Sequence, residues 1–397
     1  MHSSHIILSL IAWLIGVVWL YKLFEAARGL PTVPNLLEPE YDVAPAGNPS
    51  ITVIVPARDE AANVAACLES LVDQDYDNLR VIGVDDRSTD QTGTIMDVLA
   101  GTHPDRLEVL HVTDLPANWL GKTHAMALAA QQAIATHTPD YLLFTDGDIV
   151  FRVDTIRRSL AHAVATQADH FVLLPTLTVK TRGEAMILSC LQVMSMWAVR
   201  LWRVADPRAK RDAVGVGAFN LIRTAVYRQL GGFDATPMEI LEDLTLGRRV
   251  KHAGFRQRMA IAPGMVCVHW AAGVFGLLNG MTKNVFAVFR FRPVFLLAGA
   301  IGLALFCIAP VAFLALPATR IPALIGLVSV VGFYVLSSRI TKISSYYAVL
   351  FPISAALLAY SMLRSMLITM FRGGVEWRGT FYKLSELRKH ADHLFWQ

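Results

Sequence analysis

The clearest indication of the fold class is the segment Tyr141-Leu142-Leu143-Phe144-Thr145-Asp146-Gly147-Asp148. It begins with a short apolar run and ends in small polar and acidic residues, which is typical of a buried strand leading into a loop. Two carboxylates, Asp146 and Asp148, then flank one glycine. Ligands of parallel α/β sheets bind outside the carboxyl ends of the strands. We therefore expect this acidic pair at a ligand-binding edge.

Further strand and helix patterns alternate upstream of this stretch. The predicted strands are 51–55, 80–84 and 107–112, and the predicted helices are 61–72, a segment from Ser88-Thr89-Asp90 to Ala100, and 124–136. Alternating β and α elements predict an α/β fold with a mainly parallel, Rossmann-like sheet.

Two other predicted strands also end in carboxylates. Asp59 follows the first, and Asp85 with Asp86 ends the second. Aspartate is also a common turn and cap residue, so each one alone is weak evidence for function. Their shared position at one sheet edge favours a binding site.

The composition indicates that part of the chain lies in a membrane. The chain has 397 residues, a net charge of +4, 54% hydrophobic residues and only 17% charged residues, against roughly 25% charged in a typical globular domain. The charge is too small to favour nucleic acid as a partner.

The four cysteines are widely spaced and form no CxxC motif, so we expect reduced thiols, without a disulfide framework or zinc site. They are Cys67, Cys190, Cys267 and Cys307.

Long apolar runs lie at both ends of the chain, at 6–21, 294–316, 321–336 and 346–370. The first is an uncleaved anchor or a signal peptide; the absence of a suitable cleavage site favours the anchor. Basic residues after it place the next domain in the cytoplasm, which predicts an inner-membrane protein. The other three runs approach the roughly 20 residues that a spanning helix needs.

Two shorter apolar stretches have a different character. Residues 274–289 have an amphipathic stripe, typical of a helix at a membrane interface or against a core. Residues 185–199 are apolar but too short to span.

Three full C-terminal spans would place the basic tail outside, so one segment is expected not to cross. The last segment, with Pro352 and Arg364, is the weakest candidate for a crossing. The side of the tail stays open.

These patterns divide the chain into five parts. We expect an anchor at 1–28, a catalytic domain at 50–270, an interfacial helix at 271–292, membrane segments at 293–371 and a basic tail at 372–397.

Acidic motifs follow one another in a recognisable order. They are Val53-Ile54-Val55-Pro56-Ala57-Arg58-Asp59-Glu60, Asp85-Asp86-Arg87-Ser88-Thr89-Asp90, Asp146-Gly147-Asp148 and Glu242-Asp243. The series resembles the family-2 glycosyltransferases of the GT-A fold. The resemblance covers roughly residues 50 to 270.

The resemblance implies an inverting transfer from a nucleotide sugar, usually a UDP-sugar, with Mg²⁺ or Mn²⁺ as cofactor. Asp148 would hold the metal, together with Asp146. Asp243 would be the catalytic base, with Glu242 as the reserve. The residues implied in donor binding are Pro56, Asp59, Glu60, Asp85, Asp86, Lys122 and Asp146.

More narrowly, the anchor, Trp119-Leu120-Gly121-Lys122 and the C-terminal spans resemble hopanoid-associated membrane glycosyltransferases and, in layout, ceramide glucosyltransferases. The QxxRW signature of those relatives and of processive synthases is replaced by residues 281–285, which disfavours processive synthesis. The segment 374–379 resembles a tail motif of lipid-modifying enzymes and has no derived role.

The leading hypothesis is a membrane-bound transferase that moves a sugar to a lipid hydroxyl, either a hopanoid-like triterpenoid or a polyprenyl phosphate. A polysaccharide glycosyltransferase and a catalytically inactive membrane scaffold are the alternatives. A transporter built on the C-terminal spans is disfavoured, because these spans contain few polar residues apart from Arg364.

Overall fold

The computed structural model describes residues 2–391, so Met1 and the last six residues of the expected tail, 392–397, lie outside the described residues. The chain forms two compact units. Unit 1 contains residues 1–32, 179–202 and 270–375, and unit 2 contains 33–178, 203–269 and the tail from Glu376. The expected five-part division stays a prediction.

Unit 2 is built on a seven-stranded sheet with the order β3-β2-β1-β4-β8-β6-β9. The strands β1 to β4 are parallel, β8 is antiparallel to its neighbours, and β6 and β9 are parallel. The bounds are β1 Ile51–Ala57, β2 Leu79–Asp86, β3 Leu107–Val112, β4 Tyr141–Phe144, β6 His170–Leu174, β8 Asn220–Arg223 and β9 Gln257–Ile261. The predicted mainly parallel α/β sheet is confirmed.

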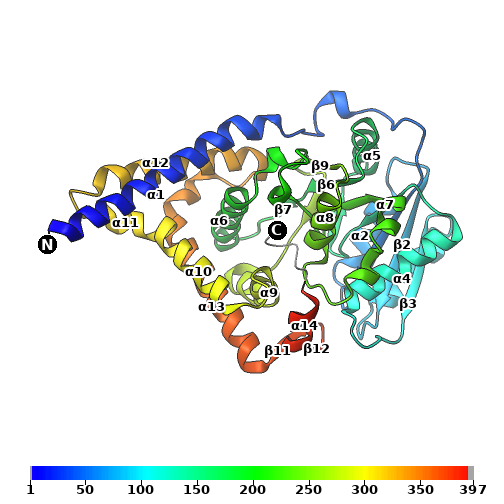
Figure 1. The fold of residues 1–397 in the computed structure, drawn as a ribbon. Helices are drawn as coiled ribbons and strands as arrows, with labels where there is room; N and C mark the ends of the chain where they lie inside the picture. Colours follow the sequence, from blue (N-terminus) through cyan, green and yellow to red (C-terminus); the bar gives the residue numbers. More distant parts are fainter. Residues whose placement is uncertain (1, 392–397) are drawn as a thin grey trace. The chain divides into compact units, whose positions relative to one another are not determined.

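Helices and short strands complete this unit, and Figure 1 shows α4 and α2 beside the sheet. The helices are α2 Val64–Val72, α3 Thr92–Thr102, α4 Gly121–Thr136, α5 Thr155–Ala165, α7 Thr224–Gln229, α8 Glu242–His252 and α14 Leu384–His390. The strands β5 Ile149–Phe151, β7 Thr176–Leu177 and β10 Val266–Val268 form a small sheet, and β11 Gly374–Trp377 pairs with β12 Thr380–Lys383.

Both faces of the central sheet are covered, because side chains of a strand alternate between its two faces. Val53 and Val55 of β1 belong to one apolar core, whereas Ile54 belongs to the other. All three side chains are fully buried. This explains why the central strands are continuous apolar runs.

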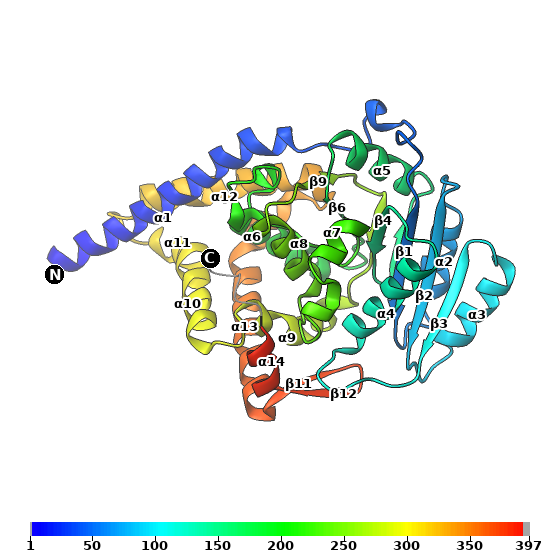
Figure 2. The ribbon, with the colours of Figure 1, turned by 45° about the vertical axis from the view of Figure 1, so that its right-hand side comes forward.

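Unit 1 is helical, and its long helices are visible in Figure 2. The helices of this unit are α1 His2–Gly29, α6 Arg182–Ala198, α9 Gly273–Val288, α10 Pro293–Leu303, the short α11 Ala309–Phe313, α12 Arg320–Thr341 and α13 Phe351–Arg372. Within the described residues, five helical segments are long and apolar enough to cross a membrane: His5–Thr32, Arg182–Arg203, Pro293–Phe313, Arg320–Thr341 and Ser345–Arg372.

The segment Arg182–Arg203 differs from the expectation, because it is helical beyond the apolar core 185–199 and thus long enough to span. The expectation that this segment is too short to span is therefore wrong. It leaves unit 2 after β7 and returns to unit 2 before β8, which pairs with β4 and β6 in the same sheet.

The first helix is an integral part of unit 1. The Trp19 indole is buried, and its Nε1 donates to the carbonyl oxygen of Phe306 at 2.8 Å. The backbone of Gly16 approaches α12 so closely that a Cβ on Gly16 would lie 2.5 Å from the Pro322 carbonyl oxygen. Such close contact of small residues is characteristic of packed membrane helices. The uncleaved anchor itself stays a prediction.

We expect Gly16→Ala to lower the melting temperature of the detergent-purified protein, because the added methyl forces α1 and α12 apart; overpacking costs about 1–3 kcal/mol. Gly302→Ala is the matched control. A Cβ there meets no atom within 4 Å, and alanine favours a helix over glycine by about 1 kcal/mol. Equal melting temperatures for the two variants would contradict this packing.

Candidate active site

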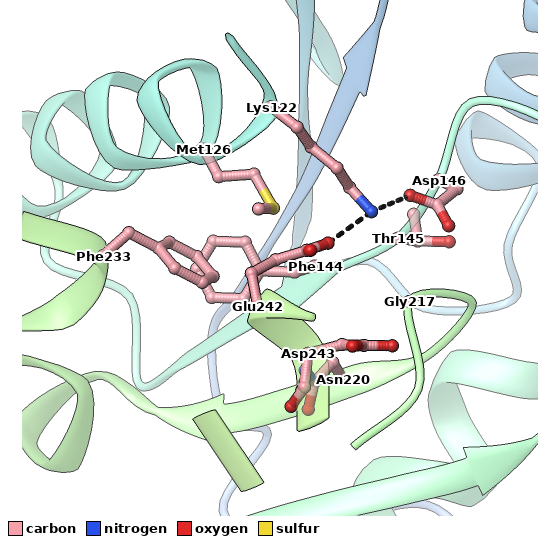
Figure 3. Close-up of a pocket in the computed structure, with 10 residues that line it drawn as sticks. All are labelled: Lys122, Met126, Phe144, Thr145, Asp146, Gly217, Asn220, Phe233, Glu242 and Asp243. Carbon is pink, nitrogen blue, oxygen red and sulfur yellow. Dashed lines mark hydrogen bonds and ion pairs between the residues drawn. The ribbon is translucent and has the colours of Figure 1, made fainter. Parts of the chain in front are cut away.

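One pocket of unit 2 joins residues from several elements and loops at the carboxyl edge of the sheet (Figure 3). Its lining residues are Lys122, Met126, Phe144, Thr145, Asp146, Gly217, Asn220, Phe233, Glu242 and Asp243. Four of these, Lys122, Asp146, Glu242 and Asp243, are predicted site residues. Residues 120 or so apart in sequence thus meet because β4, α4 and α8 end or begin at this edge.

The Lys122 ammonium lies between two carboxylates. Its Nζ is 2.5 Å from Asp146 Oδ1 and 2.5 Å from Glu242 Oε1, and Figure 3 shows the side chain reaching between them from α4. Burial lowers the pKa of Lys122, but the carboxylates of Asp146, Glu242 and Asp243 outweigh burial and hold it well above its ordinary value. Lys122 is therefore a permanent cation that joins the two acidic motifs.

Gly217 leaves room for this arrangement. A Cβ at this position would lie 2.6 Å from Asp146 Oδ2 and 3.5 Å from Lys122 Nζ. Any side chain here would displace the Asp146 carboxylate, so the loop before β8 requires glycine at this point.

Asp243 is the second residue of α8, where acidic side chains are favoured by the helix dipole. The Leu244 N–H donates to Asp243 Oδ1 at 2.6 Å. Burial, and then the neighbouring Glu242 carboxylate, raises the pKa of Asp243 above that of an ordinary aspartate. A carboxylate with a raised pKa is a better proton acceptor near neutral pH.

A series of hydrogen bonds between buried polar side chains leads to the backbone of Asp243. The Gln257 amide donates to His170 Nδ1 at 3.0 Å, so the His170 proton lies on Nε2 and is donated to Asn220 Oδ1 at 2.5 Å. Asn220 Nδ2 in turn donates to the carbonyl oxygen of Asp243 at 3.4 Å. The neutral imidazole thus orients Asn220 beneath the pocket. Nothing in the neighbouring sequence marks His170 as part of the site.

The other predicted donor-binding residues lie outside this pocket, at the ends of β1 and β2. Asp59 has a left-handed backbone, with φ of 53°, and its Oδ1 accepts hydrogen bonds from Thr89 N–H at 2.7 Å and Thr89 Oγ1 at 3.1 Å. Asp85 Oδ1 accepts from Ser88 N–H at 3.1 Å. Carboxylates thus hold the two loops together. Pro56 is buried inside β1.

A guanidinium group and an imidazole ring accompany the carboxylates of β2. Arg87 Nε donates to Asp86 Oδ1 at 2.8 Å, and the His111 ring contacts both Asp85, at 3.2 Å, and Asp97, at 2.9 Å. The hydrogen bond to Asp97, before that to Asp85, raises the pKa of His111. The sequence pattern did not reveal the His111 contacts.

Asp146 and Asp148 offer oxygen ligands for a divalent cation. Residues 2–391 contain no group of three or more His, Cys, Asp or Glu side chains that could hold a metal ion by themselves. Burial, and then the carboxylates of Asp146 and Glu60, raises the pKa of Asp148 to about 6. Mg²⁺ and similar ions are often held by one or two carboxylates together with substrate phosphates. This acidic, two-carboxylate arrangement fits such an ion.

A mainly parallel sheet with acidic loops at its carboxyl edge, followed by a helix that begins with two carboxylates, defines a transferase of the GT-A class. A family model described as "Glycosyltransferase like family 2" matches residues 49–278. The chain therefore belongs to glycosyltransferase family 2.

Individual relatives agree with this membership. An N-acetylglucosaminyltransferase of Bradyrhizobium elkanii is 32% identical over 143 residues, which are 35% of this chain and 73% of the relative. A 4,4'-diaponeurosporenoate glycosyltransferase of Staphylococcus aureus is 23% identical over 199 residues, or 50% of each chain. The chain thus matches only about half the length of the staphylococcal relative.

A solved structure agrees in fold. A mannosyltransferase of Pyrobaculum calidifontis, in complex with GDP-Man and Mn²⁺, has a TM-score of 0.51 and 20% identity over 90% of this chain and 98% of its own. This likeness shows a shared fold.

The buried His170 predicts acid sensitivity. Burial lowers its pKa to about 4, below the roughly 6.5 of an unfolded histidine. Its contribution to stability is complete above pH 6.5 or so and is lost as the pH falls from there toward 4, by about 3 kcal/mol in all.

Melting temperatures between pH 7.5 and pH 4.5 would measure this loss. We expect His170→Gln to flatten the decline with falling pH. His111→Gln should steepen it, because the raised pKa of His111 stabilises the fold at low pH. Identical slopes for wild type and both variants would exclude this role for His170.

Proposed function

We propose that this glycosyltransferase transfers a sugar, with inversion, from a nucleotide-sugar donor to the hydroxyl group of a lipid. The observation that supports the proposal is the shared Lys122 ammonium, which unites the donor-side Asp146 with the acceptor-side Glu242 in one pocket. A catalytically inactive scaffold would not need to retain these carboxylates around one lysine.

In the proposed reaction, the acceptor hydroxyl attacks the anomeric carbon as the bond from that carbon to the nucleotide diphosphate breaks. The Asp243 carboxylate removes the hydroxyl proton, and Lys122 holds Glu242 beside it. Asp148, with Asp146, would hold Mg²⁺ or Mn²⁺, which supplies positive charge for the departing diphosphate. The loops after β1 and β2, with Asp59, Glu60, Asp85 and Asp86, would bind the nucleotide.

The lipid acceptor is inferred from the membrane helices. Unit 1 exposes large apolar side chains, among them Phe275 and Val349 at 81% and Phe371 at 87%, as expected of a surface in contact with lipid. An enzyme acting on a water-soluble acceptor would need no such unit. A hopanoid-like triterpenoid, the class suggested by the sequence resemblance, is our preferred acceptor, and a polyprenyl phosphate is the alternative.

The connections of the chain also support a topology. Residues 203–269 precede the C-terminal helices and the tail from Glu376 follows them, yet both belong to unit 2. The chain must therefore cross the membrane an even number of times between them. We propose that Pro293–Phe313 and Arg320–Thr341 cross while α13 does not, and that unit 2 and the described tail face the cytoplasm. The basic residues Arg290, Arg292, Arg339 and Lys342 then all lie on the cytoplasmic side.

Contacts of α13 with the amphipathic α9 support this choice. Arg364 donates to Thr282 Oγ1 and, at 2.9 Å, to Asn279 Oδ1. Ser365 Oγ accepts from Phe286 N–H at 3.1 Å and donates to the Thr282 carbonyl oxygen at 2.5 Å. A helix paired through polar groups with an interfacial helix has no need to cross the bilayer.

We expect Asp243→Asn to lower turnover about 10²- to 10⁴-fold, the usual loss when a general base is removed. The amide keeps the shape of the carboxyl group but cannot take the proton. Donor affinity and melting temperature should stay close to wild type. Near wild-type turnover of Asp243→Asn would place the base elsewhere, and Glu242→Gln would then test the reserve residue.

The acceptor class is tested by offering the detergent-purified enzyme labelled UDP-sugars and GDP-sugars with a membrane lipid extract or with water-soluble saccharides. We expect label in the lipid fraction, and none there with Asp243→Asn. Label found only in water-soluble products would overturn the lipid acceptor while leaving the transferase activity intact.

A further inference from the structure

The C-terminal hairpin of unit 2 contacts the loops that we assign to the donor. The strands β11 and β12 are joined by the two-residue turn Arg378-Gly379. Both turn residues have positive φ angles, 49° and 73°. Asn, Asp and Gly are usual in such turns. A residue with a long side chain, such as the arginine at the first position here, is therefore unusual.

The side chain of this arginine is held by the loop after β1. Arg378 Nη2 forms an ion pair with Glu60 Oε1, and Nη1 donates to the Asp59 carbonyl oxygen at 3.3 Å. The Arg378 side chain remains 43% exposed, whereas the Glu60 side chain is only 15% exposed. Because Asp59 itself holds Thr89, Arg378 fixes a loop that spans the ends of β1 and β2.

A second contact lies at the beginning of α4. The Gly121 N–H donates to Tyr382 Oη at 3.2 Å, and the Tyr382 side chain is buried. Gly121 directly precedes Lys122, the cation that joins Asp146 and Glu242. The hairpin therefore holds both the nucleotide side and the lysine side of the site.

We propose that this hairpin completes the donor site through Arg378 and Tyr382, with Arg378 as a positioning residue for the nucleotide. Arg378 acts through the left-handed Asp59 and through Glu60, and Tyr382 acts through the start of α4. The inference rests on the proposed function, because it assigns the tail to the donor rather than to the acceptor. It gives a role to the tail motif 374–379, which the sequence alone left without one.

Calorimetric titration of the full-length, detergent-purified protein with UDP and with GDP, each in the presence of Mn²⁺, tests this role. We expect Arg378→Ala to weaken binding of the preferred nucleotide at least tenfold, as for loss of a charged hydrogen bond, and Tyr382→Phe to weaken it about fivefold. Lys383→Ala is the matched control, because it removes an exposed cation from the same hairpin. It should bind within twofold of wild type.

The KM values for donor and acceptor separate positioning of the donor from general damage. Arg378→Ala should raise the donor KM and leave the acceptor KM and the melting temperature without nucleotide unchanged. If Arg378→Ala melts early, Tyr382→Phe decides in its place. Wild-type affinity in both hairpin variants would overturn the inference but not the proposed function, and failure of the wild-type protein to bind either nucleotide would overturn both.

Discussion

The site depends on the position of one ammonium group. Lys122 Nζ contacts Asp146, which lies in the loop after β4, and Glu242, which begins α8. Without this cation, three carboxylates would face one another in a partly buried pocket, at a high electrostatic cost. The position of Lys122 follows from the start of α4, which Gly121 allows to approach β2: a Cβ on Gly121 would collide with the Asp86 carboxylate.

Two parts of the site at this carboxyl edge are held in place by different kinds of contact. The β1 and β2 loops are held by hydrogen bonds among their own polar side chains, whereas Asp243 is supported from within the sheet by Asn220 and His170. Rigid support under Asp243 and hydrogen-bonded loops at the ends of β1 and β2 suit the proposed reaction centre and the proposed nucleotide site.

Strands, helices and acidic motifs could be predicted from sequence because their signals are local. The apolar run 51–55 and the Glu242-Asp243 helix start both appear in the structure, as β1 and α8. Contacts across long sequence distances could not be predicted. Arg378 and Glu60 are 318 residues apart, and no periodicity relates them. The helical segment Arg182–Arg203 is also longer than its apolar run predicts, because polar residues that extend a helix beyond its apolar core leave no hydropathy signal.

We propose that the acidic edge of the sheet binds a nucleotide diphosphate together with a divalent cation held by Asp148 and Asp146. Electron paramagnetic resonance of Mn²⁺ measures the bound ion directly, without any need for turnover. Titration of the purified protein with Mn²⁺ should show one bound ion per chain when UDP or GDP is present, beyond the binding of Mn²⁺ to nucleotide alone. The Asp148→Asn variant should lose that ion. Nucleotide binding without Mn²⁺, or an unchanged signal of bound Mn²⁺ in Asp148→Asn, would show that these two carboxylates do not hold a metal ion for the nucleotide.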